Sequence, residues 1–303
     1  MQITKREKFL TEGYVSKPFF FDPKKIKNLS SKAAKTRSFK NIFLSEKNYL
    51  NNQLYSGVNP MPGRNLAEKL DTNFIFSNKN FREELEMVLG KKCRILDYKF
   101  VVALPNKIIP RWIQNIINND PVANMGRFIK EKYRDMTYFR GIDFHQDIID
   151  FPDRASDFIT AYIYLDKVTD KTSPLYILKK SHLLGATVFP HNLKKNSNNF
   201  FEYTNDYQKK KLVKIYKLLG EAGTMHYWHP SLLHGTQPNN SENNIRISMR
   251  ILIEKNSAQQ SNCLIDITNK KIKGSLVLTK TRSDLSANGK SKVKRNTINK
   301  FIE

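Results

Sequence analysis

The alternation of hydrophobic and polar residues predicts β-strands along much of the chain beyond its first quarter. Residues 93–104 (CRILDYKFVVAL) place large hydrophobic side chains at every second position, which is the periodicity of a strand. Four further runs are rich in β-branched and aromatic residues and are separated by turn residues. These runs are residues 157–165, 175–178, 223–228 and 245–253.

Helical spacing is clearest at residues 80–89 (NFREELEMVL), where hydrophobic residues recur every three or four positions and the pattern stops at Gly90. The first 80 residues are otherwise polar and predict loops around short helices. Residues 107–134 predict helical and connecting segments. Residues 206–219 (DYQKKKLVKIYKLL) predict a basic helix or a mixed insert.

These elements predict a mainly β protein with flanking helices, whose antiparallel core forms a barrel or a sandwich. We expect a single domain over residues 1–280, with a helical and irregular part at 1–135 and the β core at about 93–280. The core would include two weak strands after residue 254, NCLIDIT and GSLVLT. Residues 281–303 are basic and predict a flexible tail.

The net charge of +24 raises the question of a nucleic-acid partner. Lysine, asparagine and isoleucine are abundant throughout, however, which favours a general compositional bias over a dedicated binding surface. Arginine, which reads bases and phosphates better than lysine does, is much scarcer. The charge therefore favours a small-molecule partner with a slight preference for an anionic one, and leaves nucleic acid as a weaker alternative.

The remaining composition indicates a cytoplasmic protein. No hydrophobic run reaches the roughly 18 residues of a membrane-spanning helix. The N-terminus, MQITKREKFLTEG, is charged and lacks the hydrophobic segment of a secretion signal. Cys93 and Cys263 are two cysteines far apart in the sequence, which suits a reducing compartment.

All six histidines lie between residues 145 and 234, in the strand-rich part of the chain. His145 and Asp147 form a His-x-Asp motif, of which roughly half an instance is expected by chance. In a strand, residues two apart point the same way, so the two side chains would offer a nitrogen and a carboxylate to one side. A distant second histidine would complete a facial triad, which leaves three metal positions open.

His234 is the strongest candidate for that third ligand. We expect it to end a hydrophobic strand in HPSLLHGTQPNN and to face a glycine-containing turn. His226 and His229 compete for the role, His226 deeper in the strand and His229 at a bend before a proline.

A candidate anion clamp follows His234. If residues 235–244 form a hairpin turn, the returning strand brings Arg246 back beside His234. An arginine there can bind a carboxylate through two parallel hydrogen bonds, and Thr236 can add a hydroxyl. Arg250, four residues on, is the alternative clamp, and a rim ion pair is the alternative role of Arg246.

Four blocks together resemble the phytanoyl-CoA dioxygenase-like branch of the Fe(II)/2-oxoglutarate oxygenases. They are REKFLTEGYV, FHQDIIDFPDRASDFI, SPLYILKKSHLLG and GEAGTMHYWHPSLLHGTQPNNSENNIRISMR. The first is similar to the family's N-terminal helix and Gly-Tyr turn, the second to its His-x-Asp block. The third is similar to its Pro-Leu strand and Ser/Thr-His, and the last to its distal histidine and following arginine. Order and spacing agree across most of residues 6–253.

The resemblance implies a double-stranded β-helix, a jelly-roll or cupin-like barrel. It implies Fe(II) held by His145, Asp147 and His234, and 2-oxoglutarate chelating the iron with its far carboxylate on Arg246 and Thr236. O2 would be the second co-substrate, and no catalytic residue is expected beyond the metal ligands. The carboxylate of Asp147 favours hydroxylation over halogenation, because some related halogenases lack it.

The sequence also departs from the family pattern. Lys179 and Lys180 stand where the family usually has Pro-Gly before its Ser/Thr-His, and a Tyr-Ile-Tyr run follows the His-x-Asp block where some members carry an indole. The substrate pocket could draw on side chains near the motif, although core packing or a solvated position explains them equally well. The pocket candidates are Tyr138, Arg140, Tyr162 and Tyr164.

The function we expect is hydroxylation of an aliphatic C–H of a small metabolite or biosynthetic intermediate, with release of succinate and CO2. One alternative is a nucleic-acid dealkylating dioxygenase, which shares the triad but usually has a shorter gap to the distal histidine. A second is a non-catalytic metal-binding barrel protein. A third is a metal-dependent isomerase or dioxygenase that uses no 2-oxoglutarate and needs no arginine clamp.

Overall fold

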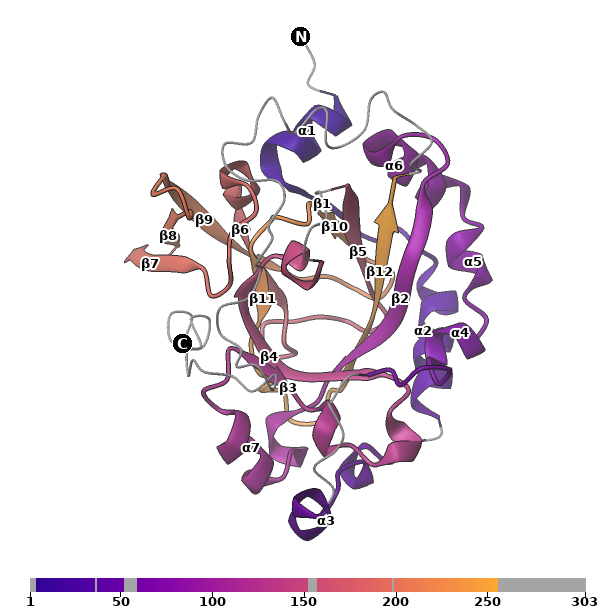
Figure 1. Ribbon diagram of the computed structural model, residues 1–303. Helices are drawn as coiled ribbons and strands as arrows, with labels where there is room; N and C mark the ends of the chain where they lie inside the picture. The colour runs from indigo at the N-terminus through magenta and orange to yellow at the C-terminus, as the bar shows by residue number, and fades with distance from the viewer. Residues whose placement is uncertain (1–3, 36, 52–58, 152–156, 198, 256–303) are drawn as a thin grey trace.

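The computed structural model describes residues 4–35, 37–51, 59–151, 157–197 and 199–255. Within these residues, twelve strands join into one continuous sheet that bends over on itself, so that its two halves face each other across an interior (Figure 1). The predicted mainly β fold with flanking helices is confirmed. The weak strands NCLIDIT and GSLVLT and the basic tail lie outside the described residues.

One half, the major sheet, draws strands from the whole chain. Its neighbours pair antiparallel, and its fifth strand, β2, leads into the other half through a short parallel pairing with β4. In sheet order the strands are β1 (Tyr14–Lys17), β10 (Met225–Trp228), β5 (Phe158–Tyr164), β12 (Arg246–Glu254) and β2 (Arg94–Ala103).

The other half, the minor sheet, is antiparallel throughout and extends beyond the major sheet on one side. In order, it holds β4 (Thr137–His145), β11 (His234–Thr236), β6 (Leu175–Lys179), β9 (Lys210–Leu218), β8 (Phe200–Thr204) and β7 (Asn192–Ser197). A further strand, β3 (Val122–Asn124), pairs with β4.

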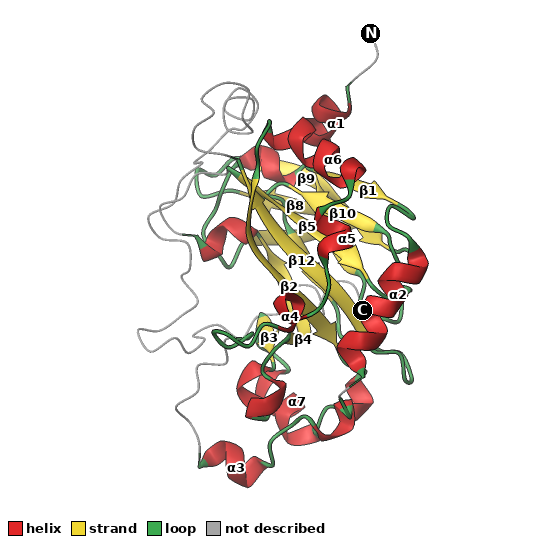
Figure 2. Cartoon of the chain, turned by 90° about the vertical axis from the view of Figure 1, so that its right-hand side faces the viewer, coloured by secondary structure: helices red, strands yellow, loops and turns green. Residues whose placement is uncertain are grey.

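Helices cover the outer side of the major sheet (Figure 2). The residues that they bury, such as Ile26 and Leu85, join Phe100 and Ile251 of the sheet in the largest hydrophobic cluster. The covering helices are α1 (Lys5–Glu12), α2 (Pro23–Ala34), α4 (Leu66–Lys69), α5 (Asn73–Phe76) and α6 (Lys79–Leu89). Two more, α3 (Glu46–Leu50) and α7 (Arg111–Ile117), lie at the lower end of the molecule (Figure 2).

The two faces of the major sheet have different chemistry. On β12 every second residue, from Ile247 to Ile253, belongs to the cluster beneath the helices. Because successive side chains of a strand point to opposite faces, Arg246 and Arg250 point into the space between the sheets. The strand therefore places hydrophobic residues outward against the helices and its two arginines inward.

The pattern-based predictions are confirmed where the periodicity is long. The helix at 80–89 is α6, closed by Gly90 at a backbone φ of 87°. The strand at 93–104 is β2, and the four later strand runs are β5, β6, β10 and β12. For residues 206–219 the sequence predicts a basic helix or a mixed insert. The helix prediction is wrong, because residues 210–218 form the strand β9 between β6 and β8.

The predicted hairpin between His234 and Arg246 is also wrong. β11 pairs with β4 and β6 of the minor sheet, whereas β12 pairs with β2 and β5 of the major sheet. The connection between the two strands therefore crosses from one sheet to the other, and His234 and Arg246 enter the interior from different sheets. Among the described residues, no helix is both long and hydrophobic enough to span a membrane.

Candidate metal centre

Three side chains that could hold a metal ion meet where β4 ends and β11 begins. One ligand atom from each of His145, Asp147 and His234 lies within 4.8 Å of the others. His145 and His234 are directly opposed across the β4–β11 pairing, with ring centroids 4.2 Å apart. His234 Nε2 lies 3.5 Å from Asp147 Oδ1, and both of these residues are buried.

The backbone that presents these groups differs from the expectation. Within the His-x-Asp motif, only His145 lies on a strand, as the last residue of β4, while Asp147 opens a 3₁₀ turn over Asp147–Asp150. His234 begins β11 instead of ending a strand, and Gly235 lies within that strand. The two side chains of the His-x-Asp motif therefore converge through a strand end and a tight turn, not through the period of two of one strand.

Both imidazoles are oriented by backbone carbonyls. His145 Nδ1 lies 3.0 Å from the Asp143 carbonyl oxygen, and His234 Nδ1 lies 2.9 Å from that of Leu232. A carbonyl can only accept, so each Nδ1 carries a proton and Nε2 is the ring nitrogen that can bind a metal ion. This is the usual way in which a protein fixes the tautomer of a metal-binding histidine.

One oxygen of the Asp147 carboxylate is fixed by hydrogen bonds, and the other faces the two imidazoles. Its Oδ2 accepts hydrogen bonds from the Thr160 hydroxyl and, at 2.8 Å, from Trp228 Nε1. Burial alone would raise the pKa of Asp147, but the His234 and His145 imidazoles and the Arg250 guanidinium hold it well below its usual range. The ionised Oδ1 could therefore serve as a metal ligand beside the two Nε2 atoms.

Gln146, the middle residue of the motif, fixes the turn. Its side-chain amide donates to the Gly185 carbonyl at 2.9 Å and to the Ser231 carbonyl at 2.7 Å, and it accepts from the Thr187 amide at 2.9 Å. Gln146 is fully buried, so these bonds are formed away from water. It ties the motif to two other loops, a role that the sequence pattern did not reveal.

Replacing Thr160 with valine should weaken metal binding about tenfold, because valine keeps the shape but leaves Asp147 Oδ2 with one donor fewer. The measurement is Fe(II) affinity under anaerobic conditions. Thr137→Val is the matched control, since Thr137 is a buried strand threonine whose hydroxyl donates to the Asn59 carbonyl instead. Equal iron affinity in both variants would show that the Thr160 hydroxyl does not tune the ligand.

Arg246 is a buried cation with an incomplete set of partners. Its guanidinium donates to the Ser173 carbonyl and, at 3.5 Å, approaches the Tyr162 hydroxyl. Its Nε has no hydrogen-bond partner, and no carboxylate of the described residues forms a salt bridge with it. A buried charge without a salt bridge is costly, so the site has the chemistry to receive an anionic ligand.

The space between the metal group and Arg246 is lined by aromatic side chains. The Trp228 ring lies 4.8 Å from His234, the Tyr162 ring lies 5.9 Å from Trp228, and the Arg246 guanidinium carbon lies 5.9 Å above the Tyr162 ring. Thr236 is buried two residues along β11 from His234, so it shares a face with that ligand. An arginine, a hydroxyl and a metal group thus face one interior.

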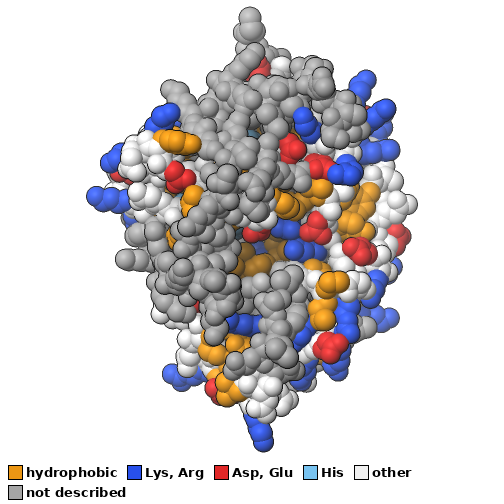
Figure 3. Space-filling view, in the orientation of Figure 1, with side chains coloured by type: hydrophobic (Ala, Val, Ile, Leu, Met, Phe, Trp, Pro, Cys, Tyr) orange, Lys and Arg blue, Asp and Glu red, His pale blue; other side chains and the backbone are white. Residues whose placement is uncertain are grey.

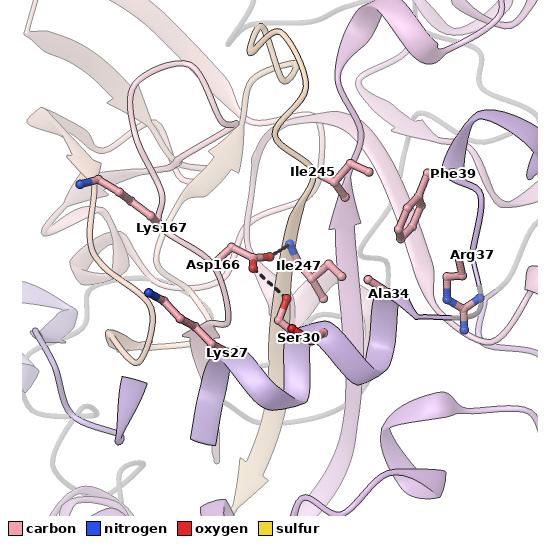
Figure 4. Close-up of a pocket in the computed structure, with 10 residues that line it drawn as sticks. Lys27, Ser30, Ala34, Arg37, Phe39, Asp166, Lys167, Ile245 and Ile247 are labelled. Atoms are coloured by element: carbon pink, nitrogen blue, oxygen red, sulfur yellow. Dashed lines mark hydrogen bonds between the residues drawn. The ribbon is translucent and has the colours of Figure 1, made fainter. Parts of the chain in front are cut away.

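A cleft on the outer side of the barrel shows how the start of β12 is fixed (Figure 4). There the Asp166 carboxylate accepts from the Ser30 hydroxyl of α2 at 2.7 Å and from the Ile247 amide at 2.8 Å. Burial raises the pKa of Asp166, opposed by these hydrogen bonds and by Arg246. Asp166 therefore anchors the residue next to Arg246 from outside, while Arg246 itself points inward.

Comparison with known proteins identifies the family. A family model described as phytanoyl-CoA dioxygenase matches residues 9–248. The chain belongs to the phytanoyl-CoA dioxygenase family. The cofactors of this family are Fe(II), 2-oxoglutarate and O2, and the His-Asp-His group matches them.

Solved structures agree with this family in fold. EvdO2 from Micromonospora carbonacea var. aurantiaca is 12% identical with a TM-score of 0.51, covering 87% of this chain and 94% of that chain. The non-heme alpha ketoglutarate dependent epimerase SnoN from nogalamycin biosynthesis is 14% identical with a TM-score of 0.50, covering 82% and 80%. The non-heme monooxygenase ThoJ is 13% identical with a TM-score of 0.50, covering 82% and 76%. No curated protein matches the sequence.

The double-stranded β-helix implied by the sequence blocks is therefore confirmed, and the structure also explains one departure from the family pattern. Lys180, where the phytanoyl-CoA dioxygenase family usually has glycine, adopts a φ of 66°, the left-handed conformation that glycine takes most readily. Lys179 and Lys180 both form ion pairs with Glu12. These lysines therefore fasten the end of α1 to the minor sheet.

The remaining pocket candidates lie at different places in the fold. Tyr162 lies between Trp228 and Arg246, and Tyr164 packs in the same interior with its hydroxyl donating to the Leu218 carbonyl at 2.8 Å. Tyr138 belongs instead to the cluster beneath the helices and donates to the Tyr133 carbonyl at 3.2 Å.

Arg140 donates to Asn106 and Asn118, beside α7. Its guanidinium therefore has partners in the loops around that helix. The structure brings Tyr162 and Tyr164 to the interior that the metal group faces, and it gives Tyr138 and Arg140 contacts elsewhere.

The competing histidines are not part of the metal group. His226 is buried against the Tyr164 ring, 4.8 Å away, and burial lowers its pKa to about 3. His229 accepts from the Ser231 amide at 3.1 Å and packs 5.1 Å from His182, with its pKa lowered by burial and by His182. Both imidazoles are therefore neutral at physiological pH.

Proposed function

We propose that the protein is an Fe(II)- and 2-oxoglutarate-dependent hydroxylase that acts on an aliphatic C–H of a small metabolite or biosynthetic intermediate. One observation carries the proposal. A His-Asp-His group and a buried arginine with no salt bridge to a described residue face the same interior of a barrel in a family of such oxygenases. Neither feature has an evident role in stability. A metal ion would bind the His-Asp-His group, and one carboxylate of a dicarboxylate would pair with Arg246.

In this proposal His145 Nε2, Asp147 Oδ1 and His234 Nε2 hold the iron. Three protein ligands leave positions for 2-oxoglutarate and O2. Arg246 and Thr236 bind the far carboxylate of 2-oxoglutarate, and the Tyr162 hydroxyl beside Arg246 supports that end. No residue beyond the metal ligands is assigned an acid–base role.

Iron with 2-oxoglutarate supplies the capacity to use O2 as an oxidant, with succinate and CO2 as products. The chain itself binds and orients. The Thr160 and Trp228 donors hold Asp147 Oδ2 in place, and the Nδ1 bonds of both histidines keep their Nε2 atoms aimed at one point. The hydrophobic residues around Tyr162 and Tyr164 exclude water from the space where a substrate C–H would lie.

The test is succinate production from isotopically labelled 2-oxoglutarate by anaerobically iron-loaded protein exposed to O2. We expect slow labelled succinate without substrate and faster turnover with a pool of small metabolites. Protein loaded with zinc in place of iron is the control and should give none. Absence of succinate from the iron-loaded protein, with and without the pool, would exclude the oxygenase reaction.

A further inference from the structure

We propose that Lys99 and Arg250 form a second anion-binding site in the barrel, which holds a carboxylate or phosphate group of the substrate beside the metal centre. The proposal rests on the proposed function, because it concerns the substrate of that site. It defines the substrate class as small molecules with an anionic group attached to the aliphatic part that reacts.

The strand register brings the two cations together on the interior face. Arg250 of β12 is directly opposite Lys99 of β2 on one side and Tyr162 of β5 on the other. Residues directly opposite in neighbouring strands project to the same face, and Tyr162 belongs to the interior cluster. Lys99 and Arg250 therefore continue an inward-facing row that starts at Tyr162.

The row lies next to the metal group. Thr160, whose hydroxyl holds Asp147, is two residues from Tyr162 on β5 and points to the same face. Two residues of a strand span about 7 Å. The electrostatic interactions agree with this placement. Arg250 contributes to the lowered pKa of Asp147, and Asp147 in turn acts to raise the pKa of Lys99.

Among the described residues, the two cations share a single carboxylate as their ion-pair partner. Arg250 Nη2 lies 2.9 Å from Asp97 Oδ2, while Lys99 Nζ is 4.0 Å from the same oxygen. Asp97 is thus shared, and its side chain is 41% exposed. Arg250 Nε is buried with no hydrogen-bond partner, and Lys99 Nζ forms no hydrogen bond within the described part of the chain.

The surroundings of Lys99 disfavour the charged form of its ammonium group. Burial and the neighbouring Arg250 lower its pKa to about 8, against the opposing effect of Asp97 and the other nearby carboxylates. A neutral residue at this position would cost the folded protein less free energy than a buried lysine does. An anion bound between the two cations would complete the hydrogen bonds of Arg250 Nε and Lys99 Nζ.

This site is separate from the proposed 2-oxoglutarate clamp. Arg246 and Arg250 are four residues apart on β12, which is about 13 Å along a strand. Arg246 is almost fully buried, whereas the side chains of Lys99 and Arg250 are about one-fifth exposed. A ligand can therefore reach the Lys99–Arg250 pair from solvent while Arg246 is enclosed.

The surface agrees with access from this side. Figure 3, in the orientation of Figure 1, shows a hollow over the centre of the barrel with hydrophobic side chains at its floor and both basic and acidic side chains at its edge. The interior cluster includes Val101, two positions from Lys99 on β2. The anion would lie on the cations and the apolar part of the substrate on this hydrophobic floor.

The experiment measures binding, not turnover, on the full chain loaded with Ni(II) and 2-oxoglutarate. The probes are phenylphosphate and benzoate, with benzyl alcohol as the uncharged counterpart. We expect one or both anions to bind and benzyl alcohol to bind at least tenfold more weakly. Lys99→Gln and Arg250→Gln should each raise the Kd of the anion about tenfold or more, and Lys217→Gln, an exposed lysine paired with Asp170, should not change it.

Asp97→Asn gives an outcome that misfolding cannot produce. It removes the competing carboxylate, so the anion should bind several-fold more tightly. The inference is overturned if benzyl alcohol binds as well as the anions, or if neither anion binds. It is also overturned if the Lys99 and Arg250 variants lose only 2-oxoglutarate affinity, which would assign the pair to the co-substrate. Anion binding without any succinate in the labelled assay would overturn the proposed reaction and not this site.

Discussion

Replacing Asp147 with alanine is expected to remove iron from the protein and to abolish succinate production. Asp147 supplies the carboxylate of the metal group, and alanine leaves only the two imidazoles. Loss of a group that merely supports a ligand lowers metal affinity about 10- to 100-fold, so loss of the ligand itself should exceed 100-fold. The measurement is bound iron per chain after anaerobic loading, together with the Kd for Fe(II).

Asp170→Ala is the matched control, because Asp170 is an exposed aspartate whose partner is Lys217 on the surface. Asp147→Asn is a second variant that keeps the shape and lets Trp228 Nε1 and the Thr160 hydroxyl retain an acceptor. If the alanine and asparagine variants both kept full iron content, Asp147 would not be a ligand.

Replacing Arg246 with methionine is expected to weaken 2-oxoglutarate binding about 100-fold or more. Loss of one partner of a buried charge pair costs about 2–5 kcal/mol of binding free energy. The stability of the protein without 2-oxoglutarate should stay the same or rise, because a buried cation without a salt bridge is replaced by a hydrophobic side chain of similar length. The measurements are the Kd for 2-oxoglutarate on Ni(II)-loaded protein and the Tm with and without it.

Arg37→Met separates this effect from a general loss of buried arginine. Arg37 is buried in an ion pair with Asp135, so its loss should destabilise the protein by about 3 kcal/mol while leaving 2-oxoglutarate affinity unchanged. Arg246→Lys should recover part of the affinity, since lysine keeps the charge but not the paired hydrogen bonds. Tight 2-oxoglutarate binding by the methionine variant would exclude Arg246 as the clamp.

The metal group could be predicted because it depends on residue types and order along the chain. The His-x-Asp motif, the distal histidine and the later arginine are visible in the sequence, and the family resemblance gives each a role. The prediction used the wrong backbone for Asp147 and the wrong pairing for Arg246. The first error arose because the motif alone does not show that the strand ends at His145. The second arose because a period of two within a segment says nothing about which strand will be its neighbour.

The supporting residues could not be predicted for the same reason. Trp228 is 81 positions from Asp147, and Gln146 contacts loops 39 and 85 positions away. β9 was mistaken for a helix because hydrophobic residues lie on both of its faces, with Val213 in one cluster and Tyr216 beside another. The strands β1, β3 and β11 have three or four residues each, too few to show a period.

On β2 and β12, residues that stabilise the fold alternate with residues that face the binding interior. Odd-numbered positions of β12 from Ile247 to Ile253 secure the helical layer, and the even-numbered positions Arg246 and Arg250 face the interior. A change at an inward position therefore alters what the barrel binds without opening the hydrophobic layer outside it. Such a scaffold can acquire new substrates by single inward substitutions, which gives the fold its capacity to diversify in evolution.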